Sequence, residues 1–470
     1  MPERTSRSDR WRWVVPLLVA AVIWLLPHGE FDARRWGLLC LFAATVCGLI
    51  TRPLPAGALV IVALTAGVLL GLVTLPEALA GFSNTTVWLI VAAFLFARGF
   101  VQTGLGERIA YRIIERLGGK PLRLGYSIAL ADLVMAPITP SNTARAGGIL
   151  FPVTLNVARA LGSEPGSSRR VGAFLLKTLY QSDLIACAMF LTAVAPNPLV
   201  AELARNASGV DVTWTTWALA AAGPGLVSLI VIPYVIFRLC PPDVRETTAA
   251  QALAVDRLTS MGPITRDQRF MVSVFGLLLV LWLTGEWHGV SATAVAYLGL
   301  SLLLVTRVLD WRDVVGETGA WDALIWFGGL VALAGELQEA GFPDALARSV
   351  GTLVGDWPWA WALTALLVVY LYAHYAFASL AAHVTAMFPA FFATALALGA
   401  PPLLAALAFG FFSSLNAATT HYGTGPAPII FGAGYLTQAE WWRIGFLISI
   451  VHVVIWLPVG FLWWKVIGLW

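Results

Sequence analysis

The chain has 470 residues, of which 59% are hydrophobic and only 12% are charged. A soluble domain is typically about 45–50% apolar and about 25% charged, so the composition predicts a polytopic membrane protein embedded in the lipid bilayer. The net charge of +3 is small and the basic residues lie in short loops, so nothing indicates a nucleic-acid partner.

The N-terminus carries four arginines ahead of an apolar run that ends at Leu26. Such a pattern resembles a signal peptide, but no small-residue cleavage site follows the run. We therefore predict that residues 1–34 are a cytoplasmic tail and a first transmembrane helix, held with its basic end in the cytoplasm.

Apolar runs of the length that crosses a bilayer, about 17–25 residues, recur along the chain. They fall near 13–27, 36–51, 54–74, 84–103, 170–191, 214–239, 269–286, 288–307, 321–340 and 441–468, with an interrupted run at 403–436. The regions 122–160 and 358–398 each hold two shorter apolar arms around a polar break. These two regions predict re-entrant hairpins, which enter and leave the membrane on the same side.

Positive charge predicts the orientation of these segments. With the N-terminus inside, the cytoplasmic loops carry Arg108, Arg112, Arg116, Lys120, Arg123, Arg169, Arg170, Arg238, Arg245, Arg257, Arg266, Arg269, Arg307 and Arg312. The opposite side carries only Arg34, Arg35, Arg205 and Arg348. By the positive-inside rule, the hairpin at 122–160 opens toward the cytoplasm and the one at 358–398 toward the outside.

The two halves of the chain show the same order of elements. Residues 35–240 and 269–470 each contain a full helix, an amphipathic arm (105–118 and 342–348), a hairpin and a helix broken by proline. The polar stretch 241–268 links the halves on the cytoplasmic side. Because the hairpins open to opposite sides, this order predicts an inverted repeat, in which secondary transporters bind substrate near the midplane between broken helices.

The first hairpin has a polar tip near residues 139–145. Ser141, Asn142 and Thr143 supply short donors and acceptors, and Arg145 adds a fixed positive charge. Irregular backbone at membrane depth is tolerated only where it is buried in protein or lines a cavity. A helix cap would also explain the three short side chains, but their place at a hairpin tip favours a site for a small anion.

The second tip, near 377–383, aligns Ser379 with Ser141 and His383 with Arg145. A charged residue in a transmembrane segment is a functional-site hypothesis by default, whereas His383 could equally be a hydrogen-bonded packing residue. His374 and His421 lie nearby, with packing or orienting roles.

The two broken helices have breaks near 192–198 and 419–428. Their candidate binding residues are Pro196, Asn197 and Pro198 in the first break and Thr424, Gly425 and Pro426 in the second. Half-helix N-termini and freed amide groups at such breaks could bind carboxylate oxygens.

Catalytic patterns are missing from the sequence. It has no nucleophile elbow, no HExxH, no phosphate-cradling loop and no paired carboxylates within an apolar region. Cys40, Cys47, Cys187 and Cys240 occur singly, which favours buried packing over a metal or redox role. The sequence predicts no enzyme, no cofactor and no metal site.

At these residues the chain resembles the divalent anion:sodium symporter (DASS) superfamily, and within it the branch of citrate/succinate and tartrate/succinate antiporters and plastid 2-oxoglutarate/malate translocators. The resemblance rests on residues 140–145, 374–379, 382–383 and 420–428 and covers roughly 35–470. It implies eleven transmembrane helices with two hairpins, a homodimer and elevator movement of a transport domain against a scaffold. It also implies that the two tips and the two breaks hold the substrate carboxylates.

The second tip departs from the sodium-coupled members, which carry Ser-Asn-Thr at both tips, because it reads Ser379-Leu380-Ala381. A dicarboxylate carries about two negative charges near pH 7, which a dry site must offset. Arg145 and His383 could supply fixed cations in place of sodium. Because a fixed charge cannot leave with the substrate, an empty carrier would return at high cost.

We therefore expect sodium-independent exchange of C4–C5 dicarboxylates of the succinate, malate or 2-oxoglutarate type, or of related tricarboxylates, across the inner (plasma) membrane. A sodium-coupled symporter of the same family is the first alternative. A polytopic membrane enzyme or an anion channel is the second.

Overall fold

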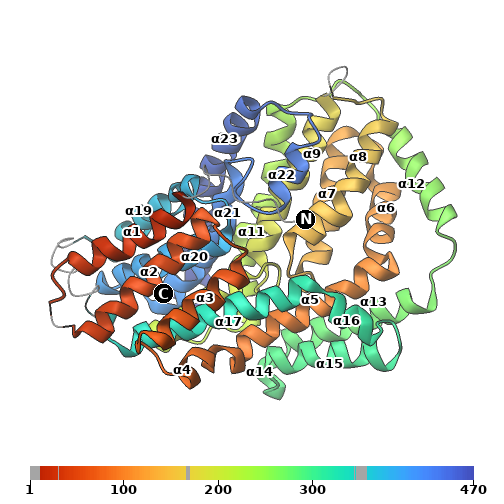
Figure 1. The fold of residues 1–470 in the computed structure, drawn as a ribbon. Coiled ribbons are helices and arrows are strands. Elements are labelled where there is room, and N and C mark those ends of the chain that lie inside the picture. Colours follow the sequence, from red (N-terminus) through yellow and green to blue (C-terminus); the bar gives the residue numbers. More distant parts are fainter. Residues whose placement is uncertain (1–10, 30, 166–169, 343–344, 346–356) are drawn as a thin grey trace.

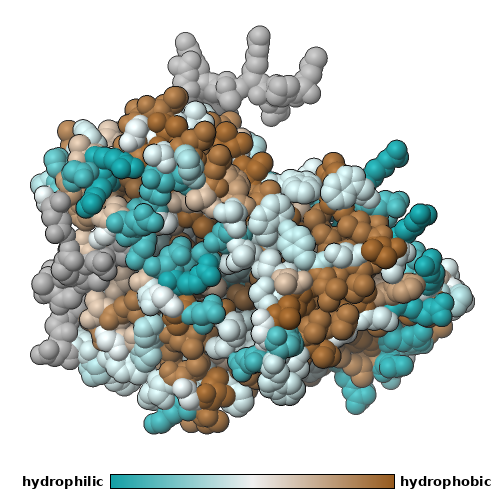
Figure 2. Space-filling view, turned by 90° about the horizontal axis from the view of Figure 1, so that it is seen from below, coloured by the Kyte–Doolittle hydropathy of each residue, from teal (hydrophilic) through white to brown (hydrophobic). Residues whose placement is uncertain are grey.

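The computed structural model describes residues 11–29, 31–165, 170–342, 345 and 357–470, and all regular secondary structure in these residues is helical (Figure 1). Eight of the described helical segments are long and apolar enough to cross a membrane. Large apolar side chains point outward along them, and Figure 2 shows hydrophobic residues over large parts of the surface with hydrophilic patches between them. The predicted all-α polytopic membrane fold is confirmed.

The first half of the chain has the predicted elements in the predicted order. Its crossings and connecting helices are α1 (Trp11–Leu25), α2 (Ala33–Thr51), α3 (Ala56–Leu69), α4 (Leu75–Ala80), η2 (Gly81–Ser83), α5 (Thr85–Thr103) and α6 (Leu105–Leu117). The first hairpin comprises α7 (Pro121–Met135), η3 (Ala136–Ile138), η4 (Thr143–Leu150) and α8 (Phe151–Ala160). The first broken helix is α9 (Arg170–Met189) with α10 (Pro196–Ser208), and α11 (Trp214–Leu239) ends the half.

The second half of the chain follows α12 (Thr248–Ser260). It contains α13 (Arg266–Leu283), α14 (Gly285–His288), α15 (Ala292–Val305), α16 (Trp311–Gly316) and α17 (Thr318–Glu339). The second hairpin comprises α19 (Trp359–Ala373), η5 (His374–Ala376) and α20 (Leu380–Ala397). The second broken helix is α21 (Pro402–Leu415) with η6 (Asn416–Ala418) and α22 (Pro426–Phe431), followed by α23 (Gln438–Trp456) and α24 (Pro458–Val466).

Local sequence signals set matching boundaries in the two halves. Helices α3 and α15 both have 14 residues, and each is followed by a left-handed residue, Gly71 (φ 69°) or Arg307 (φ 57°). The six-residue helices α4 and α16 then start with capping boxes at Thr74 and Asp310, which satisfy backbone N–H groups that have no partner inside the helix.

Between α8 and α19 the described chain runs through α9 with α10, α11, α13, α15 and α17. Entry of the two hairpins from opposite sides of the membrane stays a prediction. Figure 1 shows the N-terminal helices α1–α3 beside α19 and α20, although the end of α3 at Leu69 and the start of α19 at Trp359 are 290 positions apart in the sequence.

The polar stretch 241–268 contains the helix α12, which packs against the amphipathic helix α6. The Arg108 guanidinium donates to the carbonyls of Gly262 and Met261 at 2.9 and 3.0 Å, and the Gln251 amide donates to the Glu115 carbonyl at 2.8 Å. The division of the chain at 241–268 stays a prediction. The predicted arm at 342–348 lies largely outside the described residues.

Close packing of α23 against the second broken helix requires Gly445. A Cβ atom there would lie 2.7 Å from the Thr419 carbonyl oxygen and closer still to that of Ala418. We expect Gly445→Ala to destabilise the protein by about 1–3 kcal/mol, because backbone atoms cannot move aside as a flexible side chain would. Thermal unfolding in detergent measures this effect.

Gly276→Ala on α13 is the matched control, since a Cβ there meets no atom within 4 Å. It should leave the melting temperature unchanged or raise it slightly, because alanine favours a helix interior over glycine. Equal melting temperatures for the two variants would mean that the broken helix is not held by α23.

Candidate functional site

The two hairpin tips and the two helix breaks meet around one cavity of about 390 Å³. This volume lies in the range typical of small-molecule sites. Six of the predicted site residues line it: Ser141, Asn142, Pro196, Ser379, Thr424 and Gly425. The cavity therefore joins elements that are separated by up to about 280 residues of sequence.

The first tip packs directly onto the second helix break. The Asn142 side-chain amide donates to the Thr424 hydroxyl at 2.8 Å, and both residues are buried at the cavity wall. The Ser141 hydroxyl accepts from the Ala144 N–H at 3.2 Å. Thr143 does not line the cavity but faces Gly425, where a Cβ atom would overlap its hydroxyl. Glycine at 425 thus lets the tip and the break approach closely.

The second tip presents a less polar wall. Ser379 is the N-cap of α20, and its hydroxyl accepts from the Ala382 N–H at 3.4 Å. Leu380 and Ala381 line the cavity at the positions that correspond to Asn142 and Thr143 in the first tip. His374 lies behind this tip, fully buried, with Nε2 2.8 Å from the Gly423 carbonyl.

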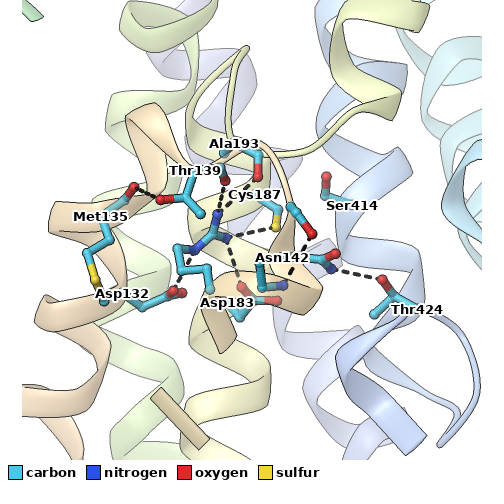
Figure 3. A network of polar contacts seen from close by, with 12 residues as sticks. Asp132, Met135, Thr139, Asn142, Asp183, Cys187, Ala193, Ser414 and Thr424 are labelled. Carbon is cyan, nitrogen blue, oxygen red and sulfur yellow. Dashed lines mark hydrogen bonds and ion pairs between the residues drawn. The ribbon is translucent and has the colours of Figure 1, made fainter. Parts of the chain in front are cut away.

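Arg145 lies beneath the first tip, fully buried, in a network drawn in Figure 3. Its Nε is 2.7 Å from Asp132 Oδ1 and its Nη2 is 2.8 Å from Asp183 Oδ1. The remaining contacts are to backbone oxygens and sulfur: the carbonyls of Thr139 (2.8 Å) and Ala193 (3.0 Å) and Cys187 Sγ (3.1 Å). All five guanidinium N–H donors are therefore accounted for.

From the sequence, Arg145 was expected to face the substrate as a fixed cation. In the structure it does not face the cavity. Its charge is offset by two carboxylates inside the protein, and it does not line the cavity. It instead joins both arms of the first hairpin to the first broken helix, since Asp132 lies on α7 and Asp183 on α9. The π-helical turn η4, a type of turn that is frequent at functional sites, carries Arg145 into this network.

His383 is likewise buried away from the cavity. Its Nδ1 pairs with the side-chain amide of Asn416. Its ring packs at 4.3 Å from Tyr370 and 4.9 Å from Phe377, measured between ring centroids. No carboxylate pairs with it among the described residues. The packing alternative that the sequence left open fits this geometry.

Three further predicted residues stand outside the cavity wall. Asn197 is fully buried, and its amide donates to the carbonyls of Cys187 (2.7 Å) and Phe190 (2.9 Å) at the first break. Pro198 lines a different cavity, and Pro426 starts α22 behind Thr424. His421 accepts from the Trp442 indole N–H at 2.9 Å, outside the cavity.

Sequence reasoning missed two features of this region. The expectation of no paired carboxylates in an apolar region is wrong, because the structure brings Asp132 and Asp183 together around Arg145. Single aspartates in the apolar runs 122–135 and 170–189 were the available signal. Arg52, which ends an apolar run before Pro53, also lines the cavity.

The second cavity, of about 360 Å³, lies between α5, α10, α11 and the α13–α15 connection. Three carboxylate residues line it, Glu202, Asp211 and Glu286, against a single Arg205. Glu202 is buried and accepts from Asn84 and Thr86, both at 2.9 Å. A cavity with this excess of negative charge would repel a dianion, so the cavity at the tips is the better anion site.

Two hairpins that meet two broken helices at one cavity are the arrangement of a class of proteins, the secondary membrane transporters built as inverted repeats. The comparison with protein families agrees. The chain belongs to the family described as "Sodium:sulfate symporter transmembrane region", which matches residues 7–470. The resemblance to the divalent anion:sodium symporter superfamily is thereby confirmed.

Similar proteins cover nearly the whole chain. "Putative malate transporter YflS" of Bacillus subtilis is 49% identical over 97% of both chains. "Dicarboxylate transporter 1, chloroplastic" of Spinacia oleracea is 44% identical over 97% of this chain and 81% of the relative. The structure of the MtrF protein of Neisseria gonorrhoeae has a TM-score of 0.59 at 12% identity, covering 97% of this chain and 94% of that one, and so shares the fold. The relatives are named transporters, and the protein is not an enzyme.

Replacing Arg145 tests its structural role. We expect Arg145→Met to destabilise the protein by about 3–5 kcal/mol, because it leaves two buried carboxylates without their counter-charge. Thermal unfolding in detergent measures the loss. Arg159→Met is the matched control, since Arg159 is 54% exposed and pairs with Glu164 at 3.7 Å. An unchanged melting temperature for Arg145→Met, together with lost anion binding, would show that Arg145 contacts the substrate.

Proposed function

We propose that this protein is a secondary transporter of C4–C5 dicarboxylates, of the succinate, malate or 2-oxoglutarate type, or of related tricarboxylates. The observation that supports this most is the cavity between the two tips and the two breaks, where short donors and acceptors of Ser141, Asn142, Ser379 and Thr424 stand beside one charged residue, Arg52. The names of the relatives, a malate transporter and a dicarboxylate transporter, point to the same substrates.

In this proposal the two tips and the two breaks together bind the carboxylates of the substrate. Ser141, Asn142 and Thr143 act from the first tip and Ser379 from the second, while Pro196 and the Thr424–Gly425–Pro426 segment act from the breaks. Helices α10 and α20 both begin at the cavity, at Pro196 and Leu380. Helix N-termini carry a positive partial charge, which favours anions. Pro196 and Pro198 have no N–H and the Asn197 N–H is bonded to the Val194 carbonyl, so the backbone donors come mainly from the start of α20. Arg145, Asn197 and His383 hold these elements in place without touching the substrate.

We propose that transport is sodium-independent exchange. Arg145 donates to four oxygen atoms beneath the first tip, so this tip is ordered without a bound cation. At the second tip, Leu380 and Ala381 offer no side-chain oxygen to sodium.

The sequence attributed exchange to the uncompensated positive charge that an empty carrier would hold. The structure gives Arg145 two aspartate partners, so its charge is already offset and the reason for exchange must be a different one. An empty cavity would instead expose helix N-termini and unpaired polar groups to a low-dielectric path, which is costly.

The movement that we propose is an elevator, in which the hairpins and broken helices slide as a transport domain along the scaffold of α1–α5 and α13–α17. A homodimer in the inner (plasma) membrane would hold the scaffold still. Arg12 and Thr51 lie on one face, where the Thr51 hydroxyl donates to the Arg12 carbonyl at 2.9 Å. The excess of basic residues on that face favours its being cytoplasmic.

Exchange is tested with purified protein in proteoliposomes. We expect labelled succinate to enter vesicles loaded with unlabelled dicarboxylate, and entry to be equal in sodium and potassium buffers. Vesicles without internal dicarboxylate should take up little label, because the empty carrier returns slowly. Sodium-driven uptake into empty vesicles would support the symporter alternative instead, and an electrical current much faster than carrier exchange would indicate a channel.

The contact between the first tip and the second break provides a second test. Thr424→Val keeps the side-chain shape but removes the acceptor of the Asn142 amide. We expect the KM for succinate to rise about tenfold, since a buried donor left without a partner costs ~1–3 kcal/mol. Thr394→Val is the control, because the Thr394 hydroxyl only donates to Ala390 within its own helix, at 2.7 Å. Equal KM values for both variants would remove Thr424 from the site.

A further inference from the structure

Arg52 is the only charged residue that lines the cavity at the hairpin tips, among the residues the structure describes there. It also lines an adjoining cavity of about 360 Å³, which shares Trp326, Ser379 and Ala381 with the first. This adjoining cavity extends past Leu49, near the end of α2, and past Pro55, just before the start of α3. Arg52 therefore stands between the tips and the membrane face that carries Arg12.

The backbone holds Arg52 in a fixed, uncommon conformation. Its φ of 52° and ψ of 56° are left-handed, and its N–H donates to the Gly48 carbonyl at 2.8 Å as the C-cap of α2. A left-handed conformation is unfavourable for a non-glycine residue and persists only where the surroundings impose it. Pro53 follows directly and fixes the chain beyond it. The side chain therefore leaves the end of α2 in a set direction.

The guanidinium of Arg52 reaches the second hairpin. Its Nη2 donates to the Ala378 carbonyl at 2.8 Å, one residue before Ser379. No carboxylate of the described chain forms an ion pair with Arg52, in contrast to Arg145 with its two aspartates. One carbonyl uses a single donor of five. The remaining donors and the full charge are available to a ligand, and a fork of this shape matches a carboxylate.

We propose that Arg52 binds one carboxylate of the substrate at the mouth of the site, on the Arg12 face of the membrane only. The inference rests on the proposed function. Because Arg52 belongs to the segment between α2 and α3, it does not travel with the hairpins. Substrate that approaches from the Arg12 face meets its charge, whereas substrate loaded from the opposite face does not. The substrate would also compete with the Ala378 carbonyl and so loosen the contact between the scaffold and the second tip.

The test compares the two faces of the membrane. Succinate exchange is measured in right-side-out and in inverted membrane vesicles for the wild type, Arg52→Gln and Arg52→Lys. We expect Arg52→Gln to raise the KM about tenfold or more from the Arg12 face, as for loss of a hydrogen bond to a charged group, and less than about twofold from the other. Arg52→Lys should recover part of the loss, because it keeps the charge without the fork.

Arg307→Gln is the matched control. Arg307 is also exposed, also left-handed at φ 57° and also at a helix end, but it lines neither cavity. It should leave both KM values unchanged. Melting temperatures without substrate, measured for all variants, check that each one folds.

Three results would overturn the inference. An unchanged KM in Arg52→Gln, or a rise that is equal from both faces, would do so while leaving the proposed function intact. A wild-type protein that neither exchanges succinate nor gains thermal stability from it would overturn the proposed function, and this inference with it.

Discussion

The buried guanidinium of Arg145 is the interaction on which the rest of the site depends. A cation in the apolar interior needs counter-charge and acceptors for each donor. The structure supplies them from α7, the first tip, α9 and the first break. A single side chain thereby fixes the position of the hairpin relative to the broken helix. Polar residues in the interior of this protein determine which helices meet.

The second half of the chain meets the same requirement with different chemistry. His383 stands at the position of Arg145, but it pairs with the amide of Asn416 and packs among aromatic rings. The two hairpins are thus held differently, the first by ion pairs and the second by an amide and aromatic rings. With the charges of Arg145 satisfied internally, the cavity wall combines apolar side chains with a few short polar groups, helix ends and one arginine from outside the hairpins.

Much of the architecture followed from the sequence, because a bilayer restricts what a chain can do. The helix at 214–239 has the bounds that the apolar run predicted, and both hairpins fall where two short apolar arms flank a polar break. The site was less complete. Ser141, Asn142, Pro196, Ser379, Thr424 and Gly425 reach the cavity, whereas Arg145 and His383 do not. Residue type and position along a hairpin do not show toward which side a long side chain turns.

The sequence by itself determined that the protein lies in the membrane, since this depends on local hydrophobicity. It also predicted the order of crossings and the repeat from charge and helix-breaking residues. Only the tertiary structure decided how the charges are used. Asp132 and Asp183 are 51 positions apart and become partners of one arginine. Arg52 and Ala378 are 326 positions apart and touch at the site. Electrostatic pairing depends on distances of a few ångströms, and packing between helices that are remote in sequence sets those distances.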